Sequence, residues 1–271
     1  MRRNIYEVLK SGNIDIKKEY SRIYDLFYVV SFDSSYYIQP VTLEDVVIEC
    51  FNTLNPNLIG RCISFEDFNE SYNYQFVPQP KEFTLETLIE LSEYVINFVR
   101  ALMMVPMDAH IGLQTLHKIE MHIESCMEDV GYKKVERDGI IIFVESNQAA
   151  ISVSEAIEPQ LSYSVLEYNH YRLKGNLARK KDILKNMADS IEHDRDVLKS
   201  INNNFTSDLF QLFNKFVRHD NADNNYISSM SVSEIEDVYD DIYQMWLLAK
   251  LQLEQLDRND KIRDIIKKIN G

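Results

Sequence analysis

The chain has little of what flexible, disulfide-bonded or membrane-spanning proteins need. Its 271 residues include 7 glycines and 6 prolines, which argues against long flexible linkers and small β-barrels. The three cysteines, Cys50, Cys62 and Cys126, show no Cys-x-x-Cys spacing, so we expect reduced thiols. No uninterrupted apolar run approaches the roughly 20 residues of a membrane helix, and the first residues contain no apolar signal core. These absences predict a cytoplasmic protein that does not enter membranes.

Positive charge is also scarce. The chain has 29 Lys and Arg against 43 Asp and Glu, a formal net charge of −14. Such a balance disfavours general binding to DNA, because attraction to phosphates needs a basic surface. The sequence also lacks the glycine-rich loops that bind phosphate and the Gly-x-Ser-x-Gly nucleophile elbow of hydrolases. We therefore expect no cofactor.

Histidines next to glutamates raise the question of a metal site. Glu167 and His170 have the Glu-x-x-His spacing of di-iron helical bundles, but a second copy of this motif is missing. His117 and His122 do not share one helical face, since five residues turn a helix by roughly 140°. The sequence predicts no metal site.

What the chain does contain is a periodic apolar pattern. Its hydrophobic content is 45%, enough for a buried core. Apolar residues recur at helical spacing, which predicts a mainly α fold built as a helical bundle. Asp138-Gly139, flanked by apolar stretches, predicts one β-hairpin over about 132–145. The expected helices occupy residues 43–54, 84–106, 116–131, 149–171 with a break near Pro159, 184–201, 209–218 and 235–249.

The N-terminal region is less regular than the rest. Residues 1–80 are rich in aromatic and polar side chains and weakly periodic, and they end at Pro78-Gln79-Pro80. Proline clusters commonly mark boundaries. We therefore predict an α-rich N-terminal region of residues 1–80 and a helical domain of residues 81–271.

The end of the helix at Arg218 gathers polar groups that could perform chemistry. Arg218 offers a planar fork of donors suited to phosphate, and His219 can act as a general acid or base near neutral pH. Asn214 lies one helical turn before Arg218, and Asn221 follows in a polar loop. Two interpretations stay open: a nucleic-acid or phosphate site, or ordinary capping, since cations are common at helix C-termini.

This segment resembles the HEPN superfamily, in which a helix within a small bundle ends in Arg and a polar residue. HEPN proteins are all-helical, often dimeric bundles among bacterial toxins and phage-defence proteins, and many are metal-independent ribonucleases. Their motif places a His four to six residues beyond the Arg. Arg218 matches the Arg and His219 the polar position, but Asp223, Asn224 and Asn225 stand where the His is expected.

The resemblance covers residues 162–271 and implies two alternatives. One is a catalytically inert module that binds RNA or a protein in a defence or toxin–antitoxin type system. The other is a metal-independent endoribonuclease in which Arg218 holds the phosphate and His219 transfers the proton. The missing downstream His favours the inert module.

A basic segment precedes this motif. It contains Arg172, Lys174, Arg179, Lys180, Lys181 and Lys185. Such a cluster could follow an RNA backbone, and Tyr168 and Tyr171 could stack on bases. The alternative is a solvated helix face balanced by the acidic run from Glu234 to Asp241.

The last long helix predicts self-association. Tyr239, Tyr243 and Trp246 lie beside its apolar stripe, so one stripe could face the core and the other a second copy. We expect a homodimer through the C-terminal bundle; the alternative is that one protomer buries both stripes. If Arg218 is instead buried against Glu236, Asp237 or Asp240, the motif is structural.

Overall fold

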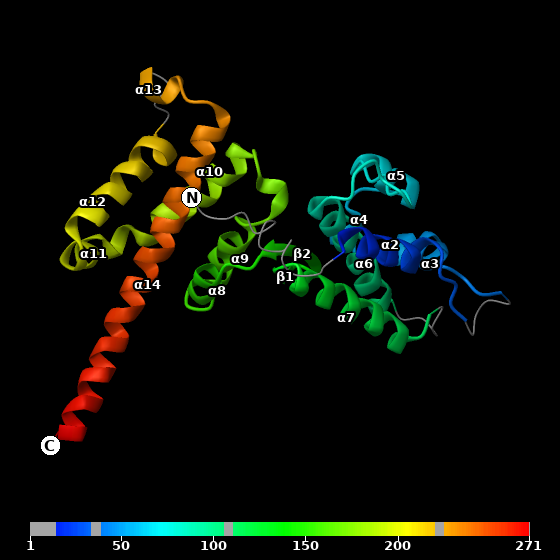
Figure 1. The fold of residues 1–271 in the computed structure, drawn as a ribbon, viewed down its shortest axis with the longest axis horizontal. Coiled ribbons are helices and arrows are strands. Elements are labelled where there is room, and N and C mark those ends of the chain that lie inside the picture. Colours follow the sequence, from blue (N-terminus) through cyan, green and yellow to red (C-terminus); the bar gives the residue numbers. More distant parts are fainter. Residues whose placement is uncertain (1–14, 34–38, 106–110, 220–224, 271) are drawn as a thin grey trace. The chain divides into compact units, whose positions relative to one another are not determined.

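The fold is mainly α with one β-hairpin in the part of the chain that the computed structural model describes, residues 15–33, 39–105, 111–219 and 225–270. The predicted fold class is confirmed. The chain divides into an N-terminal unit, Met1–Glu145, and a C-terminal unit, Ser146–Gly271 (Figure 1). No described helix combines the length and the apolarity needed to cross a membrane.

The N-terminal unit is a set of helices around the long central helix α6. Fourteen α6 residues are buried, from Leu85 to Leu102. Reciprocal capping boxes start two of the helices: Thr42 with Asp45 at α3, and Thr84 with Thr87 at α6. The elements are α2 (Ile16–Tyr28), α3 (Leu43–Cys50), η1 (Phe51–Thr53), α4 (Pro56–Ile59), α5 (Phe65–Ser71), α6 (Leu85–Met104), α7 (Leu113–Asp129), β1 (Tyr132–Arg137) and β2 (Ile140–Glu145).

The predicted hairpin is present, and α6 holds it in place. Strands β1 and β2 pair antiparallel, and Asp138 and Gly139 between them both have positive φ, 55° and 77°. Buried Asn97 of α6 accepts from the Ile141 backbone N–H at 2.8 Å and donates to the Ile141 carbonyl at 2.8 Å. A two-stranded sheet is marginal by itself, so these side-chain bonds supply the support it needs.

The division between units lies after Glu145, whereas the sequence analysis placed a boundary near residue 80. Helix α6 follows the proline cluster but packs on α2 and α3, which precede it. Tyr94 of α6 contacts Phe27 of α2 edge-on, with ring centroids 5.4 Å apart. Residues on both sides of position 80 therefore share one aromatic core, and Pro78-Gln79-Pro80 lies in a connecting segment.

The C-terminal unit is a helical bundle packed against the first half of α14. Its elements are α8 (Gln148–Ser154), α9 (Pro159–Glu167), η2 (Tyr171–Leu173), α10 (Leu177–Ile191), η3 (Glu192–Asp194), α11 (Arg195–Ile201), α12 (Asn203–Leu212), η4 (Phe213–Arg218), α13 (Asn225–Ser228) and α14 (Val232–Asn270). Trp246 of α14 is fully buried at the centre, and its indole N–H donates to the Met187 carbonyl of α10 at 2.9 Å.

Two breaks separate helices in this unit, and the sequence predicted one of them. The break near Pro159 is present, because Pro159 begins α9 after α8 has ended. The single helix expected over 184–201 is interrupted by the short 3-10 turn η3, so α10 and α11 are separate helices. Because the apolar spacing continues through η3, the sequence pattern could not reveal this turn.

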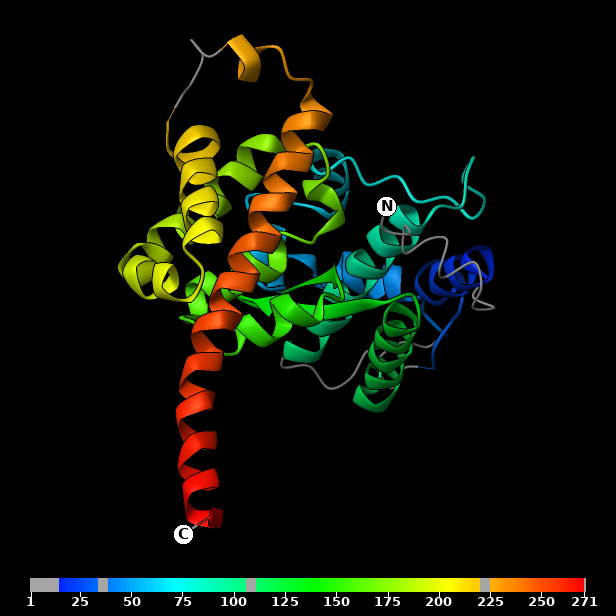
Figure 2. The same cartoon turned by 60° about the vertical axis from the view of Figure 1, so that its left-hand side comes forward.

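Helix α14 extends beyond the other helices of its unit. In Figure 2 the C-terminal half of α14, drawn in red, projects past α10, α11 and α12. Residues 261–270 are all exposed, whereas Ile242, Tyr243, Trp246 and Leu247 are buried in the bundle. One helix therefore has a core-forming first half and a solvent-exposed end.

Candidate functional site

Arg218 is presented by a π-helical segment, not by the end of an α-helix. The last turns of the predicted helix form η4, Phe213–Arg218, which follows α12 without a break. Phe213 and Val217 are buried, which anchors the segment in the core. The Tyr239 hydroxyl donates to the Phe216 carbonyl at 3.4 Å. Wide π-turns are frequent at functional sites, so the contacts of Arg218 decide its role.

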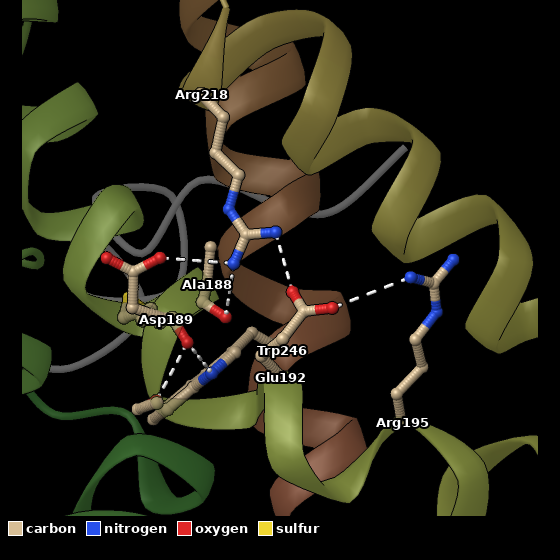
Figure 3. Close-up of polar contacts among 8 residues, drawn as sticks. Ala188, Asp189, Glu192, Arg195, Arg218 and Trp246 are labelled. Atoms are coloured by element: carbon tan, nitrogen blue, oxygen red, sulfur yellow. Dashed lines mark hydrogen bonds and ion pairs between the residues drawn. The ribbon is translucent and has the colours of Figure 1, made fainter.

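Both terminal nitrogens of the Arg218 guanidinium donate hydrogen bonds to residues of α10 and η3 (Figure 3). Nη1 donates to Glu192 at 2.6 Å, and Nη2 donates to Asp189 and to the Ala188 carbonyl, each at 3.1 Å. The side chain is 22% exposed. Burial opposes the charged form, but the bonds to Glu192 and Asp189 outweigh it and raise the pKa of Arg218.

These contacts make Arg218 part of the C-terminal cap of α10. The last carbonyls of a helix lack intrahelical donors and favour a nearby cation. Arg218 serves the Ala188 carbonyl, and Lys250 of α14 donates to the Ser190 carbonyl at 3.3 Å and to Asp194 at 3.2 Å. Capping was one of the two interpretations of Arg218, with its own helix as the expected target. The helix it caps is α10.

The carboxylates that hold Arg218 are not those named from the sequence. Glu236 and Asp240 of α14 pair with Lys180 instead, at 2.8 and 2.7 Å. The reason is topological: η4 packs against α10, so Arg218 meets the residues at the C-terminal end of that helix. Glu192 and Asp189 supply the negative charge there.

His219 and the two asparagines do not form a described cluster with Arg218. His219 lies just past η4 in extended backbone and is exposed. Asn214 is half-buried within η4. Asn221 lies outside the described residues. Arg218 points toward α10 (Figure 3), and its three described contacts include neither His219 nor Asn214.

Two residues of the basic segment, Lys180 and Arg179, are paired with acidic residues. Lys180 is 6% exposed and, besides its two carboxylates, lies over the Tyr168 ring at 5.0 Å. Arg179 holds Glu167 with two bonds, of 2.6 and 3.1 Å. These contacts match the alternative of a charge-balanced helix face. Glu167 is thereby committed to Arg179 and not to a metal site.

The remaining basic residues are spread along the chain. Arg172, Lys174 and Lys185 are exposed, and Lys181 is half-buried. Arg172 stacks over Tyr171 at 5.7 Å. Along α10, Lys180 and Asp189 are about 13 Å apart at 1.5 Å per residue. Lys180 and the residues that contact Arg218 therefore lie toward opposite ends of α10, whereas Lys185 lies one turn from Asp189.

Four of the five aromatic residues assigned to RNA or to a second copy are buried, and the fifth, Tyr171, is half-buried. Tyr168 is 4% exposed and stacks on Tyr243 with ring centroids 4.1 Å apart. Tyr239, Tyr243 and Trp246 are 5%, 1% and 0% exposed. Tyr168 is too buried to stack on a base, and the other three cannot drive a dimer because one protomer already buries them.

A feature that the sequence did not reveal lies between α2 and α7 in the N-terminal unit. His122 of α7 approaches Glu19 of α2, with Nε2 and Oε2 3.7 Å apart, and Arg22 contacts the same carboxylate at 3.3 Å. His122 lines two cavities. The helix at 16–28 was not predicted, although the helical spacing of Tyr20, Ile23 and Phe27 could have indicated it.

Comparison of the chain with protein-family models, with curated proteins and with solved structures gives no match. The geometry of the described residues makes Arg218 a cap that is held by two carboxylates.

Proposed function

We propose that the chain is a catalytically inert, HEPN-like interaction module of a defence or toxin–antitoxin type system, and that its partner is a protein. The observation that carries this proposal is the exposed end of α14. Ile262, Ile265, Ile266 and Ile269 are 48%, 56%, 49% and 76% exposed. Their spacing places all four on one face of the helix, within an arc of about 100°. Four neighbouring isoleucines in water favour a partner that covers them.

The charges beside this face indicate the chemistry of the partner. Lys261 and Lys268 border one edge of the isoleucine face, and Arg263 lies toward the other. Pairing with an identical end would bring like charges together, which is unfavourable. An apolar groove edged by carboxylates complements the face better. This is the helix-in-groove mode, in which anchors at i, i+3, i+4 and i+7 enter the groove.

The end of α14 also has little support of its own. Isolated helices shorter than about 12–15 residues are marginal in water, and residues 261–270 have no buried member. A groove would stabilise these turns while it covers the isoleucines. Binding would then order the end of the helix and bury its apolar face at the same time.

The cationic residues give less support to RNA as the partner. Arg218, Arg179 and Lys180 are each held by one or two carboxylates. An RNA phosphate would have to displace those carboxylates before it could be bound. Exposed Arg172, Lys174 and Lys185 leave a smaller basic surface, in a chain of net charge −14.

Site-specific photo-crosslinking in cells that express the full chain tests the proposal. A photoreactive residue at position 266 should crosslink to one discrete protein. The matched control is position 264, which lies about 160° around the helix from 266. Ile262→Asp should abolish the crosslink from position 266 without unfolding the bundle. Crosslinks to RNA alone, or equal crosslinking from positions 264 and 266, would contradict the proposal.

The endoribonuclease with Arg218 and His219 is the alternative function. The exposure of His219 beside Arg218 is the observation in its favour. For this chemistry Arg218 would have to leave Glu192 and Asp189 and turn toward a bound phosphate. Cleavage of RNA that depends on both residues would support the enzyme and sink the inert module.

A further inference from the structure

The groove between α2 and α7, here called the α2–α7 groove, is a cavity of about 430 Å³ in the N-terminal unit. This volume falls in the range of small-molecule sites, roughly 300–1,000 Å³. Leu26 and Val30 line it from α2 and the residues that follow, and Ile119 lines it from α7. Val30 is 38% exposed, so part of the apolar wall faces water.

The cationic side chains at this groove retain free hydrogen-bonding capacity. Arg22 makes one described ion pair, at 3.3 Å to Glu19, and its side chain is 54% exposed. A guanidinium has five N–H donors, so most of those of Arg22 remain available. Lys118 also lines the groove, is exposed, and makes no ion pair with the described residues. Arg218, by contrast, is held by three groups.

His122 adds an unsatisfied polar atom to the wall. Its Nε2 is buried and has no hydrogen bond among the described residues, and the 3.7 Å to Glu19 is too long for one. Buried polar atoms without partners are uncommon and call for an explanation. Burial and the Arg22 charge lower the pKa of His122, against the opposing effect of Glu19. This shift favours the neutral imidazole.

The charges around the groove select the sign of a ligand. Arg22 and Lys118 face one carboxylate, Asp25, in the lining of the cavity. A second cavity of about 370 Å³ shares Arg22 and His122 and adds Lys18, but the three carboxylates of Asp15, Glu19 and Asp129 outnumber its two cations. An anionic head therefore fits the first cavity, where cations outnumber acids, and not the second.

We propose that the α2–α7 groove binds a small monocarboxylate with an apolar body. Arg22 and Lys118 hold the carboxylate, and Leu26, Val30 and Ile119 contact the body. The His122 ring lines the groove near the place proposed for the carboxylate. This site lies in the N-terminal unit and does not depend on the function proposed for α14.

Isothermal titration calorimetry of the full chain with decanoate, below its micellar concentration, tests the site. We expect saturable binding of one decanoate per chain. Decanol has the body without the charge, and butyrate has the charge without most of the body, so each should bind at least tenfold more weakly. Decyltrimethylammonium should not bind, because its charge has the wrong sign.

Variants separate the groove from the rest of the surface. Arg22→Gln and Lys118→Gln should each weaken decanoate binding about tenfold or more. Arg61→Gln is the matched control, since Arg61 is exposed and does not line the groove. Using two cationic variants keeps the test valid if one of them fails to fold, which circular dichroism would reveal. The proposal is overturned if decanoate does not bind, if decanol binds equally well, or if Arg61→Gln weakens binding as much as Arg22→Gln.

Discussion

Replacing Arg218 by Ala separates a structural role from a role in RNA binding. The substitution removes the charged donor to the Ala188 carbonyl and both ion pairs, those to Glu192 and Asp189. It leaves the C-terminal end of α10 without one of its two described cations, since Lys250 remains. We expect a less stable C-terminal unit that keeps its fold.

The expected loss follows from the exposure of the partners. Removing one member of a buried ion pair costs about 3–5 kcal/mol, because a charge is left unpaired. Here Glu192 and Asp189 are 39% and 65% exposed, so water can solvate them once Arg218 is gone. Exposed ion pairs contribute about 0.2–1 kcal/mol each, and a cation at a helix C-terminus about 0.3–1 kcal/mol. We therefore expect Arg218→Ala to lower the free energy of unfolding by about 2 kcal/mol.

Trp246 makes the measurement specific to one unit. It is the single tryptophan of the chain and is fully buried in the C-terminal unit. Its fluorescence during urea unfolding therefore reports on that unit and not on residues 1–145. Arg258→Ala is the matched control, because Arg258 is 61% exposed and pairs with Glu254 within α14. That variant should change the free energy of unfolding by less than about 0.5 kcal/mol.

Arg218→Lys refines the measurement. Lys keeps the charge but lacks the planar fork that reaches several acceptors at once, so we expect a loss of about 1 kcal/mol, between wild type and Arg218→Ala. If Arg218→Ala leaves the unfolding midpoint unchanged while it weakens RNA binding, the capping role is wrong. Arg218 would then be a surface residue that is available to phosphate.

Two further variants test the contacts that connect distant segments. Asn97→Ala should destabilise the N-terminal unit by about 2–3 kcal/mol, because the buried N–H and carbonyl of Ile141 lose their partner. Thermal unfolding followed by circular dichroism measures this loss, and a loss below about 0.5 kcal/mol would show that the hairpin does not need Asn97. Burial opposes ionisation of Glu236, but Lys180 and the Gly175 N–H outweigh it, so its pKa is lowered from the ordinary value of 4.5. The stability that Glu236 contributes is therefore fully present above pH 4.5 and is lost as the pH falls through the lowered pKa of the folded state. Glu236→Gln should flatten the pH dependence of the unfolding midpoint, followed by Trp246 fluorescence, below pH 4.5. An unchanged pH dependence would contradict the pairing of Glu236 with Lys180.

Local signals in the sequence predicted much of the secondary structure. The Asp138-Gly139 pair identified the hairpin, because its two positive-φ residues suit the tight turn that joins twisted strands. Apolar spacing located α6 and α7, and Thr42 marked the start of α3. Each of these signals extends over a few residues, which is the range that periodicity and capping rules cover.

Long-range pairing was beyond those signals. Arg218 meets Glu192 across 26 residues and Lys180 meets Asp240 across 60. Which acid meets which base depends on how α10 packs on η4 and α14, and a charge count cannot determine that. The aromatic core that α2 and α6 share is a long-range feature of the same kind, and the prolines near residue 80 could not indicate it.

The prediction for the aromatic stripe of α14 did not take account of the helices that surround it. Tyr239, Tyr243 and Trp246 were assigned to a second copy because one apolar stripe was thought sufficient for the core. In the bundle, α8 and α10–α12 all contact α14, so both stripes are buried. The isoleucines of residues 262–269 carry the exposed apolar face instead, beyond the point where the bundle ends.

RNA cleavage is the measurement that tests the central claim most directly. Wild-type protein in excess over labelled single-stranded RNA is incubated with EDTA, beside Arg218→Ala and His219→Ala, and the products are resolved on a denaturing gel. An inert interaction module predicts no cleavage above buffer for any of the three proteins. Cleavage by the wild type that both substitutions abolish, while Trp246 fluorescence shows a folded bundle, would contradict the account and establish the endoribonuclease.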